Sequence, residues 1–490
     1  MPDAPDRAPD GQGAAWGIAA ASVPMFMVAL NNLVVTNALP DIRADLDATV
    51  TGLQWVVNGY ILAFAGLLLT GAALGDRYGR RRVFIGGIVL FCVGSVACAL
   101  SASVPALVAA RVLQGAGAAA VQPLSLVLLA SAVPESKRSA AVGLWGGVNG
   151  LGIAFGPLIG GAVTEGLQWQ WIFWINLPVG IVSVPLVLWR IRAAKGGEGA
   201  LDLVGMLLIT TAVTLAVWAI VRTADTGWTD PATLGGFGGA AVLVAAFARW
   251  ERRVASPLLP LRFFRIRTFV LSNIASLAMF FGVFGSIFFL AQYMQGPMGY
   301  SPLEAGLRTL PWTALPMLVA PLAGLVTDRV GGGRLMALGL FLQGAALGWI
   351  AVIARIDLEY ARMVPALLIA GLGMGLMLAP ATAVVLGSVR EHEYGKASGT
   401  NNTIREVGGA LGVAVLVTVF RADFDRVRIE SPVEAAHAFV AGMSAAMWVG
   451  IGAVAVGVVA SLLIPRAGAA PDPPAARQTP PPLENVQGAK

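Results

Sequence analysis

The stretch GAALGDRYGRRR (residues 71–82) has a counterpart far along the chain, GLVTDRVGGGR (residues 324–334). Both contain Asp-Arg-x-Gly in a short polar loop between long apolar runs. The glycines allow a tight reversal between antiparallel helices, and the aspartates can cap the next helix or pair with arginine. One copy alone fits an ordinary hairpin, but two copies predict a chain of two related halves. The candidate gating residues are Asp76, Arg77, Gly79, Arg80, Asp328, Arg329 and Gly331.

Composition indicates that these halves lie in a membrane. Of the 490 residues, 57% are hydrophobic and only 12% are charged, whereas soluble proteins carry about 25% charge. The net charge of +6 could suggest nucleic acid, but basic cytoplasmic loops explain it, and we expect no nucleic-acid partner. A spanning helix needs about 20 mostly apolar residues. Fourteen such segments start near Trp16, Leu53, Val83, Pro105, Ala141, Trp171, Leu203, Leu234, Phe269, Ala305, Leu335, Met363, Ala397 and Phe439.

An even number of spans places both termini on one side, and the Lys and Arg residues decide which. Most of the 33 fall on the side that holds both termini, so that side is predicted to be cytoplasmic, in the plasma membrane. We predict an all-α protein with cytoplasmic tails at 1–15 and 466–490, the second one disordered. Two six-helix bundles (16–192 and 256–465) flank two inserted helices within 193–255.

A few charged residues fall within or at the edge of spans, where charge is costly and marks function by default. Arg111 lies in the fourth span with Gln114 three residues on, and the alternative is an arginine that snorkels to the interface. Glu406 follows Arg405 in the thirteenth span; it either lines a cavity or forms an interfacial ion pair. Asp41 lies at the edge of the first span. Arg111, Asp41, Glu406 and Arg405 are the candidates for ion coupling.

Glycines repeat every four residues in GIAFGPLIGG (residues 152–161). Gly152, Gly156 and Gly160 form one flat stripe, Gly161 adjoins it, and Pro157 favours a kink. A flat stripe beside a kink suits helices that pack tightly in one state, although simple packing is the plainer interpretation. We count these residues among the gating candidates.

The first span, MFMVALNNLVVTNALPDI (residues 25–42), carries polar groups without charge. Asn32 and Thr36 share one helix face, which predicts a polar stripe toward a transport path with Asn31 to one side. Aromatic and methionine side chains of later spans can line an apolar cavity or simply pack in the core. The candidate path residues are Asn31, Asn32, Thr36, Gln114, Asn149, Met279 and Met374.

These motifs together resemble a known group. DRYGRRR, ARVLQGAGAAA, GIAFGPLIGG and WQWIFWINLPVG resemble motifs of the major facilitator superfamily, and within it the fourteen-spanner drug:proton antiporters. The resemblance implies alternating access, a loop that gates the inner side, an arginine of the fourth span in proton coupling, and export of drugs or antibiotics. Substrate and protons are then the partners, beside the lipid bilayer, for a protein that functions as a monomer.

The chain departs from the family pattern in its first span. LNNLVVTNALP has Asn31 where the family has an aspartate, and asparagine cannot exchange a proton near neutral pH. Three hypotheses remain open: a proton antiporter, an uncoupled or differently coupled exporter, and a non-transporting sensor or scaffold. No ATP-binding motif is present. Cys92 and Cys98 lie in one apolar run and are interpreted as packing residues without metal spacing. For a transporter of this kind we predict no enzyme activity, no cofactor and no metal.

Overall fold

The computed structural model describes residues 11–133, 138–191, 201–254, 257–390, 393–424 and 431–465. Most of both predicted tails lies outside these ranges. So do the side chains of Asn32, Thr36, Pro157 and Asp328. Every regular element in the described ranges is helical.

The first half of the chain forms seven helices. They are α1 (Gly11–Asp45), α2 (Val50–Tyr78), α3 (Arg80–Ala99), α4 (Val104–Ser131), α5 (Arg138–Gly166), α6 (Trp171–Trp174) and α7 (Asn176–Arg190). A hairpin follows, made of α8 (Leu203–Thr226) and α9 (Pro231–Glu251). The second half contains η2 (Leu261–Arg265), α10 (Arg267–Gln295), α11 (Pro302–Thr313), α12 (Leu315–Val330), α13 (Gly332–Ile353), α14 (Tyr360–Gly387), α15 (Tyr394–Phe424) and α16 (Pro432–Leu462).

Twelve segments of the described residues are long and apolar enough to cross a membrane, not fourteen. Two of them join successive helices, α6 with α7 and α11 with α12. The helices α1 and α5 are 35 and 29 residues long, but both contain side chains outside the description, and neither is among the twelve. The chain is therefore an all-helical polytopic membrane protein, and the count of fourteen remains a prediction.

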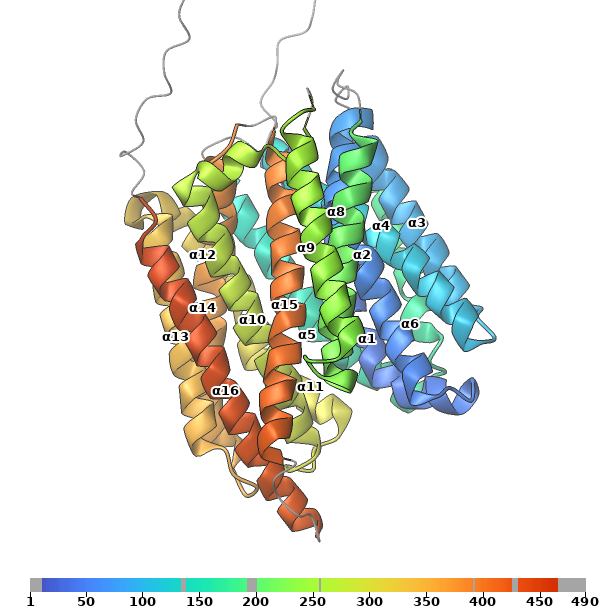
Figure 1. The fold of residues 1–490 in the computed structure, drawn as a ribbon, viewed down its shortest axis with the longest axis vertical. Coiled ribbons are helices and arrows are strands. Elements are labelled where there is room, and N and C mark those ends of the chain that lie inside the picture. Colours follow the sequence, from blue (N-terminus) through green and yellow to red (C-terminus); the bar gives the residue numbers. More distant parts are fainter. Residues whose placement is uncertain are drawn as a thin grey trace, which may run out of the picture.

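The two halves repeat the same packing pattern. In the first, α2 and α3 pack on α4, and α1 packs on α5; in the second, α13 packs on α14, and α10 packs on α15 and α16. The halves meet where α5 contacts α12 and α14, and where α15 contacts α2 and α4. Figure 1 shows the helices standing side by side along one axis. We call the end at the top of Figure 1, which contains Gly79 and Gly331, the upper end.

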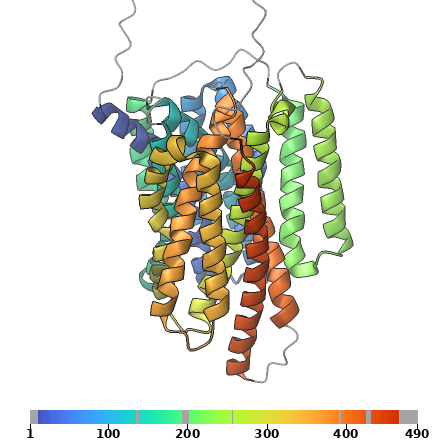
Figure 2. The same ribbon diagram turned by 90° about the vertical axis from the view of Figure 1, so that its left-hand side faces the viewer.

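The hairpin α8–α9 stands at the side of the bundle (Figure 2) and contacts both halves through α8. Thr70 of α2 and Thr210 of α8 share a hydrogen bond of 3.0 Å between their hydroxyls. At the lower end, Trp228 Nε1 donates to Thr418 Oγ1 of α15 at 2.8 Å. The hairpin therefore covers the line where α2 meets α15.

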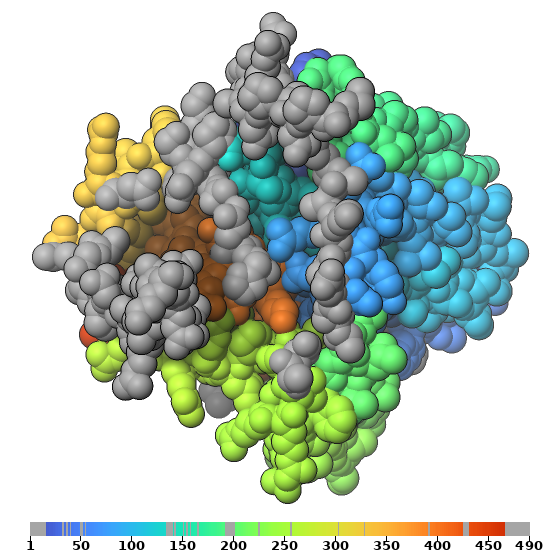
Figure 3. Space-filling view, turned by 90° about the horizontal axis from the view of Figure 1, so that it is seen from above, coloured from blue at the N-terminus to red at the C-terminus, as the bar shows by residue number. Residues whose placement is uncertain are grey.

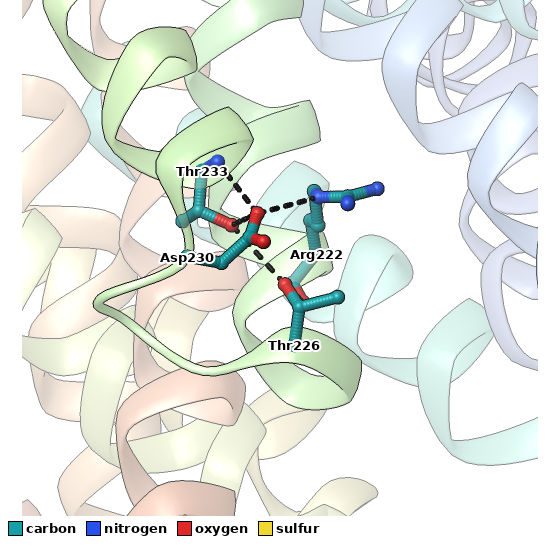
Figure 4. Close-up of polar contacts among 4 residues, drawn as sticks. All are labelled: Arg222, Thr226, Asp230 and Thr233. Carbon is teal, nitrogen blue, oxygen red and sulfur yellow. Dashed lines mark hydrogen bonds and ion pairs between the residues drawn. The ribbon is translucent and has the colours of Figure 1, made fainter.

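A small polar cluster fixes the turn that contains Trp228 (Figure 4). Asp230 Oδ2 accepts from the backbone N–H of Thr233 at 3.0 Å and from Arg222 Nε at 3.1 Å. The Thr233 backbone bond and then the arginine hold the pKa of the Asp230 carboxyl below its usual value. The Thr226 and Thr233 hydroxyls share a bond of 3.3 Å. These contacts fix the turn from which Trp228 reaches α15.

Candidate functional site

Arg111 is buried in the middle of the first half, with 1% of its surface exposed. Its Nη1 donates to Asn31 Oδ1 at 2.5 Å and to Gln114 Oε1 at 2.6 Å. Its Nε donates to the Val56 carbonyl at 3.2 Å. The guanidinium lies 4.2 Å from the centre of the Tyr60 ring, close enough for a cation–π contact. Arg111 therefore does not snorkel to an interface, because its charge is held inside the bundle.

Neutral groups surround this charge. Gln114 Nε2 donates to Ser95 Oγ at 2.7 Å, and Asn176 Nδ2 reaches the same hydroxyl at 3.3 Å. We call Asn31, Gln114, Tyr60 and the Val56 carbonyl, which contact the guanidinium, the Arg111 cage. None of these groups is a carboxylate, so fixed dipoles compensate the burial of the charge. Asn31, expected to one side of a polar stripe, is fully buried at the centre of this network. Its Nδ2 has no hydrogen-bond partner among the described residues.

The second half contributes a different pair of charges from α15. Arg405 is buried, its Nη2 donates to Thr382 Oγ1 at 2.9 Å, and its guanidinium lies 5.4 Å from the centre of the Phe280 ring. The neighbouring Glu406 is near enough to interact electrostatically with Arg405 and with Tyr60 of the first half. Tyr60 therefore contacts the Arg111 network and lies within electrostatic range of the Glu406 carboxyl.

A narrow opening, with a cavity volume of only about 10 Å³, lies between the halves, and the Phe280 ring that Arg405 contacts forms part of its wall. It brings together three residues expected on the substrate path: Asn149 of α5, Met279 of α10 and Met374 of α14. The lining is apolar except for the Asn149 amide, and in this conformation the opening has room for about one water molecule. The other lining residues are Phe280, Val283, Phe284 and Leu378.

The halves are in contact at the upper end. Gln122 Nε2 of α4 donates to Asn402 Oδ1 of α15, and Ser398 Oγ donates to the Pro123 carbonyl, each at 3.4 Å. One buried apolar cluster contains side chains from both halves, among them Leu69, Ala73, Val385, Leu386 and Ala397. Figure 3, viewed from this end, shows blue and orange atoms near the centre and green atoms of the hairpin side at one edge. We call these contacts the upper gate.

The repeated loops form matching turns at this end. Gly79 has φ 96° and ψ 122°, and Gly331 has φ 93° and ψ 126°. Residues other than glycine rarely adopt this backbone conformation. Asp76 Oδ1 accepts from Arg80 Nε at 3.0 Å. No side chain caps α3 at Gly79, so Asp76 pairs with arginine instead of capping the next helix. Arg329 is exposed, and Arg77 is half-buried.

Asp76 also adjoins the first turn of α15. A Cβ atom added at Gly395 would lie 2.7 and 2.8 Å from the two carboxylate oxygens of Asp76. Any other residue at this position would force the Asp76 carboxylate to move, because ordinary Cβ contacts begin at about 3.4 Å. The loop of the first half therefore contacts the second half directly through Asp76.

The glycines of α5 also permit close approaches. A Cβ at Gly152 would lie 2.6 Å from Ala29 Cβ of α1, and one at Gly161 would lie 3.4 Å from the Leu303 nitrogen of α11. Gly156 and Gly160 are buried. Gly147, outside the predicted stripe, would bring a Cβ to 2.8 Å from Met317 Cα of α12. The helix α5 therefore packs closely on its own half and on the other.

The structure separates Asp41 from these groups: it is exposed at the lower end of α1. Asn32 and Thr36 cannot be placed, because their side chains lie outside the description. Sequence reasoning missed Tyr60, Ser95, Asn176 and Thr382. Each is a polar residue inside an apolar span, and that signal was available, but such residues are too common to indicate their partners.

Two repeated helical halves that enclose an opening and close at one end define a membrane transporter in which the halves move against each other. The chain belongs to the Major Facilitator Superfamily, whose family model matches residues 22–413.

Several relatives are similar over most of their length. The chain is 35% identical over 410 residues to the tetracenomycin C resistance and export protein of Streptomyces glaucescens. The matched region covers 83% of this chain and 76% of the relative. It is 38% identical over 403 residues to the cephamycin export protein CmcT of Amycolatopsis lactamdurans, with coverage of 80% and 82%. It is 36% identical over 405 residues to the multidrug resistance protein Stp of Mycobacterium tuberculosis, with coverage of 82% and 75%. The chain is a drug exporter of this superfamily.

Solved structures show the same fold. The human organic anion transporter MFSD10 aligns with a TM-score of 0.60 at 15% identity, covering 90% of this chain and 99% of that one. The proton:xylose symporter XylE aligns with a TM-score of 0.63 at 15% identity, covering 93% and 96%. At this identity the likeness concerns the fold alone.

Proposed function

We propose that this protein is a fourteen-helix plasma-membrane exporter that uses proton antiport to move small amphiphilic molecules out of the cell. In this proposal α1 and α5 complete the spans, and α8 and α9 are inserted between two six-helix bundles. The upper end and both termini face the cytoplasm, as the basic loops indicate. The protein acts as a monomer by alternating access, with the upper gate closed in the conformation described.

The observation that carries this proposal is the opening between the halves. In the conformation described the opening is too small for a substrate, but its apolar wall and the single amide of Asn149 suit a ligand with a large apolar body once the halves move apart. Compared with the aspartate of the family pattern, Asn31 leaves the first half with one negative charge fewer, which favours neutral or anionic substrates over cations. Relatives named for tetracenomycin C and cephamycin support an antibiotic or similar secondary metabolite as substrate.

Glu406 is the proton carrier in this proposal. An antiporter needs a carboxyl group that substrate and proton can compete for, and a carboxyl inside the membrane suits this role. Glu406 interacts electrostatically with Arg405 and lies within electrostatic range of Tyr60, which contacts Arg111. Asp41, the other acidic candidate, is exposed at the lower end, so Glu406 takes precedence.

The test is efflux from proteoliposomes driven by an imposed pH gradient. Glu406→Gln keeps the shape of the side chain and removes the titrating group, so we expect pH-driven efflux to fall at least about tenfold, with substrate binding retained. The matched control is Glu359→Gln, because Glu359 is an exposed carboxylate at the lower end that forms an ion pair with Arg362. Full pH-driven efflux by the Glu406 variant would refute the assignment.

A differently coupled exporter is the second candidate, because the Arg111 cage is neutral. Where the family has an aspartate, Asn31 gives this arginine an amide oxygen, so the first half cannot contribute a proton at that position. Efflux that continues unchanged in the presence of a proton ionophore would favour this candidate. Failure to move any tested solute in vesicles would instead favour a sensor or scaffold.

A further inference from the structure

Two carboxyl groups meet at the upper end of the hairpin, away from the opening. Asp202 immediately precedes α8, and Glu251 is the last residue of α9. Their exposed fractions are only 8% and 5%. A Cβ added at Gly205 would lie 2.2 Å from Asp202 Oδ2 and 3.0 Å from Glu251 Oε1. Both carboxyl groups therefore crowd around one point beside the backbone of Gly205.

Each carboxyl group uses one oxygen to hold the protein together. Asp202 Oδ1 accepts from the Gly205 backbone N–H at 2.8 Å and from Trp250 Nε1 at 2.7 Å. Glu251 Oε1 accepts from the Leu258 backbone N–H at 3.1 Å. The remaining oxygens, Asp202 Oδ2 and Glu251 Oε2, are buried and have no donor among the described residues.

One proton shared by the two carboxyl groups would relieve their crowding. The two side chains are close enough to share a hydrogen bond, but two ionised carboxylates can only accept. If one group is protonated, its O–H can donate to the other, and the repulsion between two buried anions disappears.

Within the described ranges, no buried cation neutralises the pair instead, and the half-buried Lys396 of α15 donates to the Pro257 carbonyl. The arginines nearest in the chain, on the end of α9, the segment after it and η2, are all exposed. They are Arg249, Arg252, Arg253, Arg262 and Arg265. The buried arginines of the described chain, Arg111 and Arg405, belong to the transport site. The first turn of α8 contains no acidic or basic residue.

A chain of contacts leads from this pair to the upper gate. Leu258, held by Glu251, lies in the segment that joins the hairpin to the second half. The carbonyl of Pro257 in that segment accepts from Lys396 Nζ of α15 at 2.5 Å. Arg262 of η2 forms an ion pair with Glu393, just before α15. The same turn of α15 contains Gly395, against which Asp76 packs.

We propose that Asp202 and Glu251 bind one cytoplasmic proton between them and that this proton keeps the upper gate closed. Loss of the proton leaves two buried negative charges that repel each other. When the two side chains move apart, Glu251 no longer fixes Leu258, and the contact between Pro257 and Lys396 of α15 is weakened. In an exporter that admits protons, an acidic cytoplasm then slows further proton entry. The assignment of this end to the cytoplasm rests on the proposed function; the contacts do not.

The variant Glu251→Gln tests the role of the proton while it keeps the shape of the side chain. The amide can keep its oxygen on the Leu258 N–H and donate its N–H to Asp202 Oδ2, so it imitates the protonated pair at every pH. Asp202→Asn can do the same from the other side. Both replacements keep the volume of the side chain, and a monodisperse protein with unchanged exchange in α13 shows that the fold is intact.

The experiment is hydrogen–deuterium exchange of the peptide that begins α15, in lipid nanodiscs from about pH 6 to about pH 8.5. The exchange rate of the wild type divided by that of Glu251→Gln cancels the intrinsic effect of pH. We expect a ratio near one in acid and at least about threefold at alkaline pH, with the same result for Asp202→Asn. The control Asp357→Asn, in an exposed lower loop, should follow the wild type.

A ratio that does not change with pH would overturn the proposal. An Asp202→Asn protein that exchanges faster at all pH values would also overturn it, because the aspartate would then serve only as a helix cap. The readout needs neither substrate nor a proton gradient. It therefore remains informative if pH-driven efflux fails, and a failure here leaves the transport proposal standing.

Discussion

Replacing Gly395 with alanine should open the upper gate. The added Cβ would lie 2.7 and 2.8 Å from the Asp76 carboxylate oxygens, whereas ordinary contacts begin at about 3.4 Å. Asp76 must therefore withdraw by about 0.6–0.7 Å. It is held by Arg80 at 3.0 Å, so the withdrawal lengthens or breaks this bond in the closed state alone.

The magnitude follows from that bond. A hydrogen bond between charged groups contributes about 1.5–3 kcal/mol, and partial exposure of both side chains, 23% and 18%, reduces this to about 1–2 kcal/mol. A change of this size shifts the closed-to-open ratio by roughly 5- to 30-fold. Alanine also favours the helix over glycine, but both states contain that helix, so this gain cancels.

The assay uses spin labels placed on α4 and α15 at the upper end. The distribution of distances between them is measured by double electron–electron resonance spectroscopy in nanodiscs. We expect the population with long distances to grow in Gly395→Ala. The matched control is Gly387→Ala at the end of α14, where an added Cβ meets nothing within 4 Å. Equal distributions for Gly395→Ala and the wild type would refute the reasoning, as would an equal shift in the control.

Three other outcomes are expected. Asn31→Asp places a carboxyl against Arg111, so efflux should acquire a second pH-dependent step; a pH–rate profile that superimposes on the wild type would contradict the geometry of the cage. Because the folded pKa of Asp230 is depressed, it stabilises the protein above its unfolded pKa of about 3.9, and the benefit is lost as pH falls through the folded pKa. The melting temperature of Asp230→Asn should therefore lie below that of the wild type at neutral pH and converge with it in acid. Gly79→Ala should destabilise the protein by about 1–3 kcal/mol because φ is 96° there, and Gly331→Ala should do so equally; a melting temperature unchanged in either would contradict the matching turns.

The candidate site was only partly readable from the chain. A buried arginine inside an apolar span is costly wherever it lies, so the sequence of the fourth span is enough to single out Arg111. The position of Asn31 against it could not be predicted, because helical spacing relates residues within one helix but does not fix how two helices face each other. The same limit left Tyr60 unnoticed and placed Asp41 among the coupling groups, although it is exposed at the lower end.

By itself the sequence determined that this chain lies in a membrane and that the glycine turns of the two loops match, and it predicted two related halves with an insertion between them. These features depend on composition and local backbone preference, which act over a few residues. Only the tertiary structure decided which half supplies each group of the opening, that α8 contacts both halves, and that Asp202 and Glu251 come together across the hairpin. Such contacts join residues far apart in the chain, and they depend on how whole helices pack, which no short stretch of sequence contains.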